Sequence, residues 1–145
     1  KWDLVEKDNS TMNEFREQAS EMFQFAPWAP IVFVSALTGQ RVDRIMETAL
    51  HVFGERQKRV TTGEMNRLLR EAVAKHPPPS RPSRWVKFYY ATQSDIEPPR
   101  FIFFCNDPKS VHFSYQRYLE NEIRDRYGFD GTPISLHFRG RRDDD

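Results

Sequence analysis

Residues 101–105 read FIFFC and are followed by NDP at 106–108. A short, continuous apolar run that ends at a proline-containing turn is typical of a strand in a packed core. The preceding residues, EPP at 97–99, predict a turn. A second strand is predicted before that turn, over residues 85–90, because alternate residues there differ in character. Its inner set is Val86, Phe88 and Tyr90, and its outward set is Trp85, Lys87 and Tyr89.

The segments on either side of this strand pair predict two helices and a third strand. Residues 61–64 (TTGE) form a capping box that begins a short helix, and the proline loop at 76–82 (HPPPSRP) stops it. A longer helix is expected from about Tyr115 to Gly128, followed by a strand over 134–138. Residues 61–140 therefore predict an α+β unit of order α-β-β-α-β, with a three-stranded sheet and its helices on one face. Residues 54–60 read as a charged connector and 141–145 as a charged tail.

The first third of the chain predicts a different kind of structure. A capping box at 11–14 (TMNE) leads into a helix, and a second helix ends near Gly54. Between them, residues 31–34 (IVFV) resemble a strand that is buried on both faces, as in a parallel sheet. The order α-β-α suits a piece of an α/β domain, but a lone parallel strand has no partner here. We therefore expect residues 1–53 to pack against further chain or to adopt a non-native arrangement.

Composition narrows the class of protein. The hydrophobic share of 38% suits a packed core, and no run reaches the roughly 18 apolar residues that a membrane span needs. Cys105 is the single cysteine, so an internal disulfide is excluded and a cytoplasmic protein is expected. The four histidines have no metal-binding spacing. Residues 54–145 hold 17 Lys/Arg against 13 Asp/Glu, a mild basic excess that is compatible with nucleic acid.

Two short motifs indicate a guanine-binding site. Lys1-Trp2-Asp3 begins the chain, and Ser35-Ala36 directly follows the predicted strand, at the edge where α/β sheets bind ligands. The Asp3 carboxylate can accept hydrogen bonds from the N1–H and exocyclic amine of guanine, a donor pair that adenine lacks. The Lys1 stem can lie over the base, and the Ala36 backbone N–H can donate to the guanine carbonyl. Ser35 shapes the turn.

These motifs resemble the Asn-Lys-x-Asp and Ser-Ala-Lys/Leu motifs of translation-factor-class GTPases, although the chain begins at the Lys. The remainder resembles the Der (EngA) family, bacterial GTPases with two tandem G domains and a C-terminal KH-like domain. The similar stretches are NRLL at 66–69, KHPPP at 75–79, YYATQ at 89–93, PPRF at 98–101, FCNDP at 104–108, FSYQRYLEN at 113–121 and GTPI at 131–134. The resemblance implies that residues 1–53 end the second G domain and that 61–140 are the KH-like domain.

The resemblance also implies a GTPase that acts in assembly of the large ribosomal subunit. Its cofactor is GTP or GDP, with Mg²⁺ held by residues that this sequence lacks. No Gly-x-x-x-x-Gly-Lys-Ser/Thr loop and no Asp-x-x-Gly switch occur here. We therefore expect no catalytic residue in this chain, no GTP hydrolysis by it alone and no cofactor bound to it alone.

The sequence leaves open which binding partner the second unit has. KH modules hold RNA with a Gly-x-x-Gly loop between two helices, but residues 128–131 (GFDG) lead directly into a strand. A helix C-cap followed by a turn is the favoured interpretation. The outward Trp85, Lys87 and Tyr89 could stack RNA bases or dock the protein's own G domains, and docking is favoured. Ribosomal RNA and ribosomal proteins are the other expected partners. The alternatives are a stand-alone KH-type RNA-binding module and a non-enzymatic scaffold.

Overall fold

The computed structural model of the chain describes residues 1–6, 10–79 and 85–140. Its elements follow one another as a short 3-10 helix η1 (Trp2–Leu4), α1 (Thr11–Met22), α2 (Asp43–Arg56), α3 (Thr62–Lys75), β1 (Phe88–Ile96), β2 (Pro99–Cys105), a short 3-10 helix η2 (Pro108–Ser110), α4 (Phe113–Tyr127) and β3 (Ser135–Gly140). The predicted tail at 141–145 and the end of the proline loop at 80–82 lie outside the described residues.

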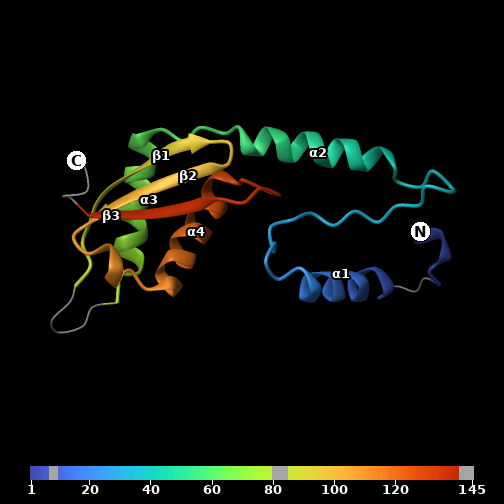
Figure 1. Cartoon of the computed structure of the whole chain (residues 1–145), viewed down its shortest axis with the longest axis horizontal. Helices are drawn as coiled ribbons and strands as arrows, with labels where there is room; N and C mark the ends of the chain where they lie inside the picture. The colour runs from blue at the N-terminus through green and yellow to red at the C-terminus, as the bar shows by residue number, and fades with distance from the viewer. Residues whose placement is uncertain (7–9, 80–84, 141–145) are drawn as a thin grey trace.

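The second unit has the predicted order α-β-β-α-β, here α3-β1-β2-α4-β3. Strand β2 lies in the middle of the sheet, antiparallel to β1 and parallel to β3. Helices α3 and α4 both cover one face of this sheet (Figure 1). The largest fully buried side chains come from both layers, including Met65 and Leu68 of α3, Phe101 and Phe103 of β2 and Leu119 of α4. The α+β architecture is therefore confirmed.

Two helix ends in this unit follow from their capping residues. The Thr61 hydroxyl accepts a hydrogen bond from the Glu64 backbone N–H, while the Glu64 carboxylate accepts one from the Thr61 backbone N–H, so the predicted capping box is present. Helix α4 ends at Gly128, whose φ of 85° lies where glycine avoids the steric cost of a side chain. Local sequence chemistry thus sets where α3 begins and α4 ends.

Strand β1 corrects the predicted alternation. Phe88 lies opposite Cys105, but Tyr90 lies opposite Phe104, so two residues of β1 stand against one of β2. This bulge moves the residues beyond it to the other face of the sheet. Tyr90 therefore does not face the helices: it stacks on Phe104 at 4.2 Å between ring centroids, outside the core. Tyr89 instead lines a groove beside α3.

The first third of the chain has the two predicted helices but not the predicted strand. Residues 31–34 are half-buried and have no strand pairing, because the described residues place no neighbouring strand beside them to complete their hydrogen bonds. The capping box predicted at 11–14 is also wrong: Ser10 is the N-cap of α1, and Thr11 is already helical. Helix α2 runs through Gly54 to Arg56, which shortens the predicted connector.

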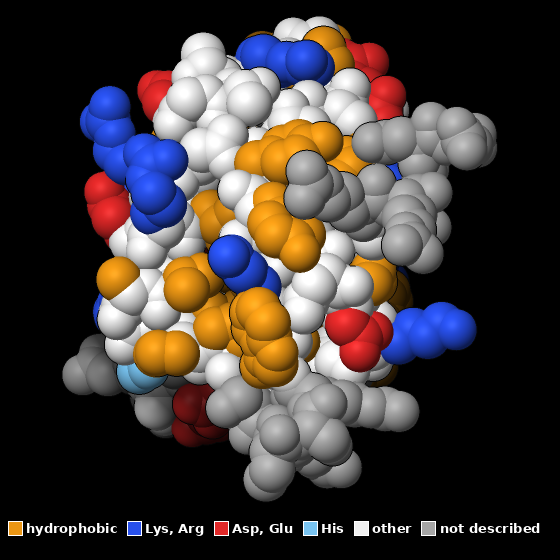
Figure 2. Space-filling view, turned by 90° about the vertical axis from the view of Figure 1, so that its left-hand side faces the viewer, with side chains coloured by type: hydrophobic (Ala, Val, Ile, Leu, Met, Phe, Trp, Pro, Cys, Tyr) orange, Lys and Arg blue, Asp and Glu red, His pale blue; other side chains and the backbone are white. Residues whose placement is uncertain are grey.

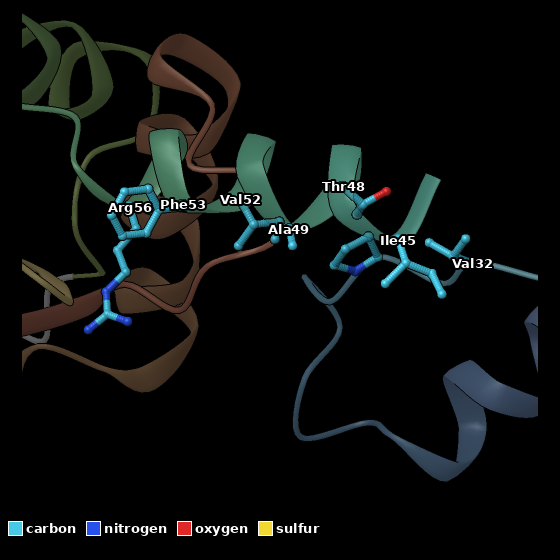
Figure 3. A pocket seen from close by; sticks show the side chains of 9 residues that line it. Val32, Ile45, Thr48, Ala49, Val52, Phe53 and Arg56 are labelled. Carbon is cyan, nitrogen blue, oxygen red and sulfur yellow. The ribbon is translucent and has the colours of Figure 1, made fainter. Parts of the chain in front are cut away.

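The apolar sides of α1 and α2 are exposed on the surface. Met22, Phe23, Ile45, Leu50 and Phe53 are all exposed, and α2 extends away from the second unit (Figure 1). The described residues form a hollow along α2, and Figure 3 shows Ile45, Ala49 and Val52 on its wall near Val32. This wall is mostly apolar and lacks a cluster of polar groups for a small ligand. That residues 1–53 pack against further chain or adopt a non-native arrangement stays a prediction.

Candidate functional site

The two predicted guanine motifs meet in space. The Trp2 backbone N–H donates to the Val34 carbonyl at 3.0 Å, which lays the start of the chain beside the extended segment 31–34. The Ser35 hydroxyl donates to Asp3 Oδ1 at 2.5 Å, and Ser35 Oγ accepts from the Thr38 backbone N–H at 3.2 Å. Ser35 is fully buried. The Ser35 side chain therefore ties the Asp3 carboxylate to the loop that follows segment 31–34.

The arrangement around Asp3 suits a planar base with adjacent donors. Asp3 is half-buried, whereas Lys1 and Ala36 are exposed. The bond from Ser35 restrains one carboxylate oxygen, and a carboxylate has lone pairs to accept further donors. Lys1, Asp3, Ser35 and Ala36 are thus brought to one place by contacts between segments far apart in the sequence. Their role in binding guanine stays a prediction.

The described residues do not meet the requirements of a metal site, a membrane-spanning helix or a reactive cysteine. No group of three or more His, Cys, Asp or Glu residues there could hold a metal ion. Within the part of the chain that the structure describes, no helix has the length and apolar character to cross a membrane. Cys105 is fully buried, and burial raises the pKa of its thiol to about 11, so it is an inert core residue.

The three residues predicted to point outward from the sheet do not form one surface. Trp85 is 60% exposed, and Lys87 is exposed beside it. The Asn106 side chain fixes this segment, because it accepts from the Lys87 backbone N–H at 2.7 Å and donates to the Trp85 carbonyl at 2.8 Å. Tyr89, however, lies on the helix side, where it and Leu69 line the groove beside α3. The outward position belongs to Tyr90, which changes the expected trio.

The end of the molecule away from α2 carries exposed apolar side chains. Figure 2 looks at this end, where hydrophobic side chains gather around a basic side chain. A separate observation is a groove between α3 and β1, which is lined by residues that include Arg70, Val73 and Tyr89. A mixed apolar and basic surface fits docking of a protein, which the sequence favours, and it also fits stacking of bases.

The Gly-x-x-Gly letters at 128–131 form a cap and turn. Gly128 is the C-cap of α4 and donates its backbone N–H to the Arg124 carbonyl at 2.8 Å. Phe129 is fully buried and lies edge-on to Phe101, at 5.6 Å between ring centroids. A loop that is anchored through its second residue in the core is not an open clamp for a nucleotide backbone. The interpretation as a C-cap and turn is confirmed.

Sequence reasoning missed two buried polar residues at the junction of α2 with the second unit. Glu55 is 8% exposed and Gln93 is 2% exposed. Glu55 lies in the charged segment 54–60, which resembles ordinary solvated surface, and Gln93 lies beyond the β1 bulge. The signal in the sequence was weak, because a polar residue reveals its burial only through its partners.

Comparison with known proteins agrees with the family resemblance of the sequence. A family described as the KH-domain-like region of EngA bacterial GTPase enzymes, C-terminal, matches residues 59–139. The protein named GTPase Der from Thermomicrobium roseum is 59% identical over 97% of this chain and 31% of its own length. The proteins of that name from Moorella thermoacetica and Desulforamulus reducens are 52% and 50% identical, over 99% and 100% of this chain. The chain spans about a third of the length of these relatives.

Proposed function

This chain belongs to the Der (EngA) family of bacterial GTPases, and we propose that it supplies two parts of such an enzyme. Residues 1–53 are the end of the second G domain, which recognises guanine, and residues 61–140 are the KH-like domain. The phosphate-binding loop and the Mg²⁺ ligands belong to parts of the longer protein that this sequence does not contain. GTP hydrolysis is therefore an activity of the longer protein, and this chain alone is inactive.

The hydrogen bond between Ser35 and Asp3 is the observation that supports this proposal best. It holds one carboxylate oxygen from the side of the loop, so the carboxylate keeps one orientation in which its oxygens accept N1–H and the exocyclic amine of guanine. The exposed Ala36 follows directly and supplies a backbone N–H for the guanine carbonyl. The stem of Lys1 covers the face of the base. These residues select the base and take no part in bond breaking.

The KH-like domain docks, in this proposal, onto the protein's own G domains and onto the large ribosomal subunit in the cytoplasm. Docking is favoured over single-strand RNA binding because the Gly-x-x-Gly stretch at 128–131 lacks the open clamp of KH modules. The mild basic excess of residues 54–145 supports contact with ribosomal RNA at the edge of the docked surface. The domain then passes the nucleotide state of the G domains to the assembling subunit.

Nucleotide selectivity of the longer protein tests the guanine part of the proposal. GTP, ITP and ATP are titrated against the unmodified protein and an Asp3→Asn variant. ITP lacks the exocyclic amine, so the unmodified protein should prefer GTP over ITP and ITP over ATP, and Asp3→Asn should lose most of the first preference. Asp43→Asn on α2 is the matched control. Equal affinity for all three nucleotides in the unmodified protein would reject guanine recognition.

Ribosome binding tests the second part. The longer protein should sediment with large ribosomal subunits when a non-hydrolysable GTP analogue is present, and a version that lacks residues 61–140 should remain at the top of the gradient. Equal sedimentation of both versions would show that the KH-like domain is not the docking element. Binding of isolated single-stranded RNA by residues 54–145 at low salt, lost at high salt, would instead favour a KH-type RNA-binding module.

A further inference from the structure

The end of α2 is bound to the KH-like domain through a buried carboxylate. Glu55 Oε2 accepts the backbone N–H of Asp130 at 3.1 Å, and Glu55 Oε1 pairs with Lys58 Nζ at 2.5 Å. Lys58 Nζ also donates to the carbonyl of Tyr127 at 3.0 Å, at the end of α4. One ion pair on the α2 side therefore satisfies both a donor and an acceptor of the KH-like domain, and Glu55 would be costly to bury without these partners.

The residues that follow α2 are equally fixed. Gln93 of β1 donates to the Lys58 carbonyl at 3.0 Å and accepts from the Val60 backbone N–H at 2.7 Å. Gln57 donates to the Glu97 carboxylate at 2.9 Å, at the turn between β1 and β2. Three successive backbone or side-chain contacts leave little freedom between α2 and α3. The segment that the sequence suggests as a charged connector is packed onto the sheet edge.

The turn at 128–131 is shaped to receive α2. A Cβ on Gly131 would lie 2.3 Å from Val52 Cγ2, and a Cβ on Gly128 would lie 2.8 Å from Glu55 Oε2, so both glycines permit the close approach of the helix. On the other side, Arg124 Nη1 donates to the carbonyls of Phe129 and Thr132 at 3.0 and 3.1 Å. The turn is therefore held from the KH-like side and is not shaped by α2 alone.

We propose that residues 128–131 form a socket for the C-terminal end of α2, so that α2 and the KH-like domain move as one rigid body. The partner of this surface is a segment of the same chain, residues 51–58. The inference rests on the proposed function only in naming α2 the last helix of the second G domain. A nucleotide-dependent movement of the G domain would therefore reach the KH-like domain through α2. Any hinge between the two lies N-terminal to that helix.

Distance measurement between spin labels on the chain of residues 1–145 tests whether α2 and the KH-like domain are rigidly connected. Labels are placed through Arg44→Cys on α2 and Arg117→Cys on α4, both exposed positions. Cys105 stays unlabelled because it is fully buried. The distance distribution should be narrow, and Glu55→Ala should broaden it. Glu47→Ala, an exposed carboxylate removed from the same helix, is the matched control and should leave it narrow.

Hydrogen exchange at the Asp130 amide gives a second readout that does not need labels. This N–H should be protected, and Glu55→Ala should accelerate its exchange about tenfold or more while amides of the β2 core stay protected. Far-UV and near-UV circular dichroism confirm that the variant is folded. A broad distance distribution in the unmodified chain, or an unchanged Asp130 exchange rate in Glu55→Ala, would overturn the proposal.

A suppressor pair separates docking from turn strain. Gly131→Ala should broaden the distance distribution, because the new Cβ meets Val52 Cγ2 and the φ of 73° disfavours a side chain. Adding Val52→Ala removes the first of these effects and should narrow the distribution in part. A double variant as broad as the single one would contradict a socket for α2. None of these results depends on nucleotide, so a failure of guanine recognition in the longer protein would leave them standing, and their failure would leave guanine recognition standing.

Discussion

Gln93 accepts the backbone N–H of Val60 at 2.7 Å while its own amide donates to the carbonyl of Lys58. It donates to the carbonyl of Asp95 as well, at 3.1 Å. The side chain is almost fully buried, and only a group with both donor and acceptor atoms satisfies these partners together. A single amide therefore joins the segment after α2 to the sheet, as a strand partner would.

Replacing Gln93 with Leu should destabilise the chain by about 1–3 kcal/mol, because the Val60 N–H and the Lys58 carbonyl lose their partner in a buried place. Urea unfolding monitored by circular dichroism measures the change. Gln18→Leu on the exposed side of α1 makes the same substitution in solvent and should change stability little. If both variants unfold at the same urea concentration as the parent chain, the amide does not contribute to stability.

Two glycines should respond to alanine in opposite directions. Gly128→Ala should lower the free energy of unfolding by roughly 1–2 kcal/mol, because a φ of 85° disfavours a side chain and the new Cβ meets Glu55. Gly54→Ala lies inside α2 with nothing near its Cβ, and should raise stability by about 0.5–1 kcal/mol. Thermal unfolding of both variants checks the signs, and two shifts of the same sign would contradict this account.

Acid should weaken the contact that Glu55 makes between α2 and the KH-like domain. Burial raises the pKa of Glu55, but hydrogen bonds from Lys58 and the Asp130 N–H, with the charge of Lys58, outweigh it, so the pKa lies below 4.5. A lowered folded-state pKa gives stability that is complete above pH 4.5 and is lost as pH falls through the folded value. The other titratable groups around it are His51 and Asp130, which lie 3.8 Å apart.

Glu55→Gln removes this titration with little change of shape. Exchange of the Asp130 amide, corrected for its intrinsic pH dependence, should therefore lose protection below pH 4.5 in the parent chain and not in the variant. Nuclear magnetic resonance at stepped pH measures both. Loss of protection at the same pH in the two chains would assign the effect to a different group.

The Ser35 hydroxyl should matter for nucleotide binding and not for hydrolysis at saturating GTP. In the longer protein, Ser35→Ala removes the hydroxyl that donates to Asp3 and should weaken the binding of GTP and GDP alike by about tenfold, as expected for a hydrogen bond to a charged group. Ser20→Ala, which removes an exposed hydroxyl from α1, is the control. A fluorescent GDP titration measures affinity, and unchanged affinity in Ser35→Ala would contradict a role in holding Asp3.

The second unit was predictable because its elements are specified by neighbouring residues. The capping box at Thr61 and the glycine at the end of α4 act within one turn, and apolar periodicity marks α3, α4 and β2. The residues of the guanine motifs could also be named in advance, because their types and order match a family pattern. Their meeting through Asp3 and Ser35 is a contact that no local rule reports.

Local residue patterns by themselves determined the helices, the core strand β2 and the family of this protein, since those depend on periodicity, caps and motif letters. Tertiary structure alone decided the rest. Segment 31–34 has the composition of a strand but lacks a neighbour to pair with, and one extra residue in β1 moved Tyr90 to the outer face. Glu55 and Asp130 are adjacent only after folding, because a buried charge is stable only where distant segments supply its partners.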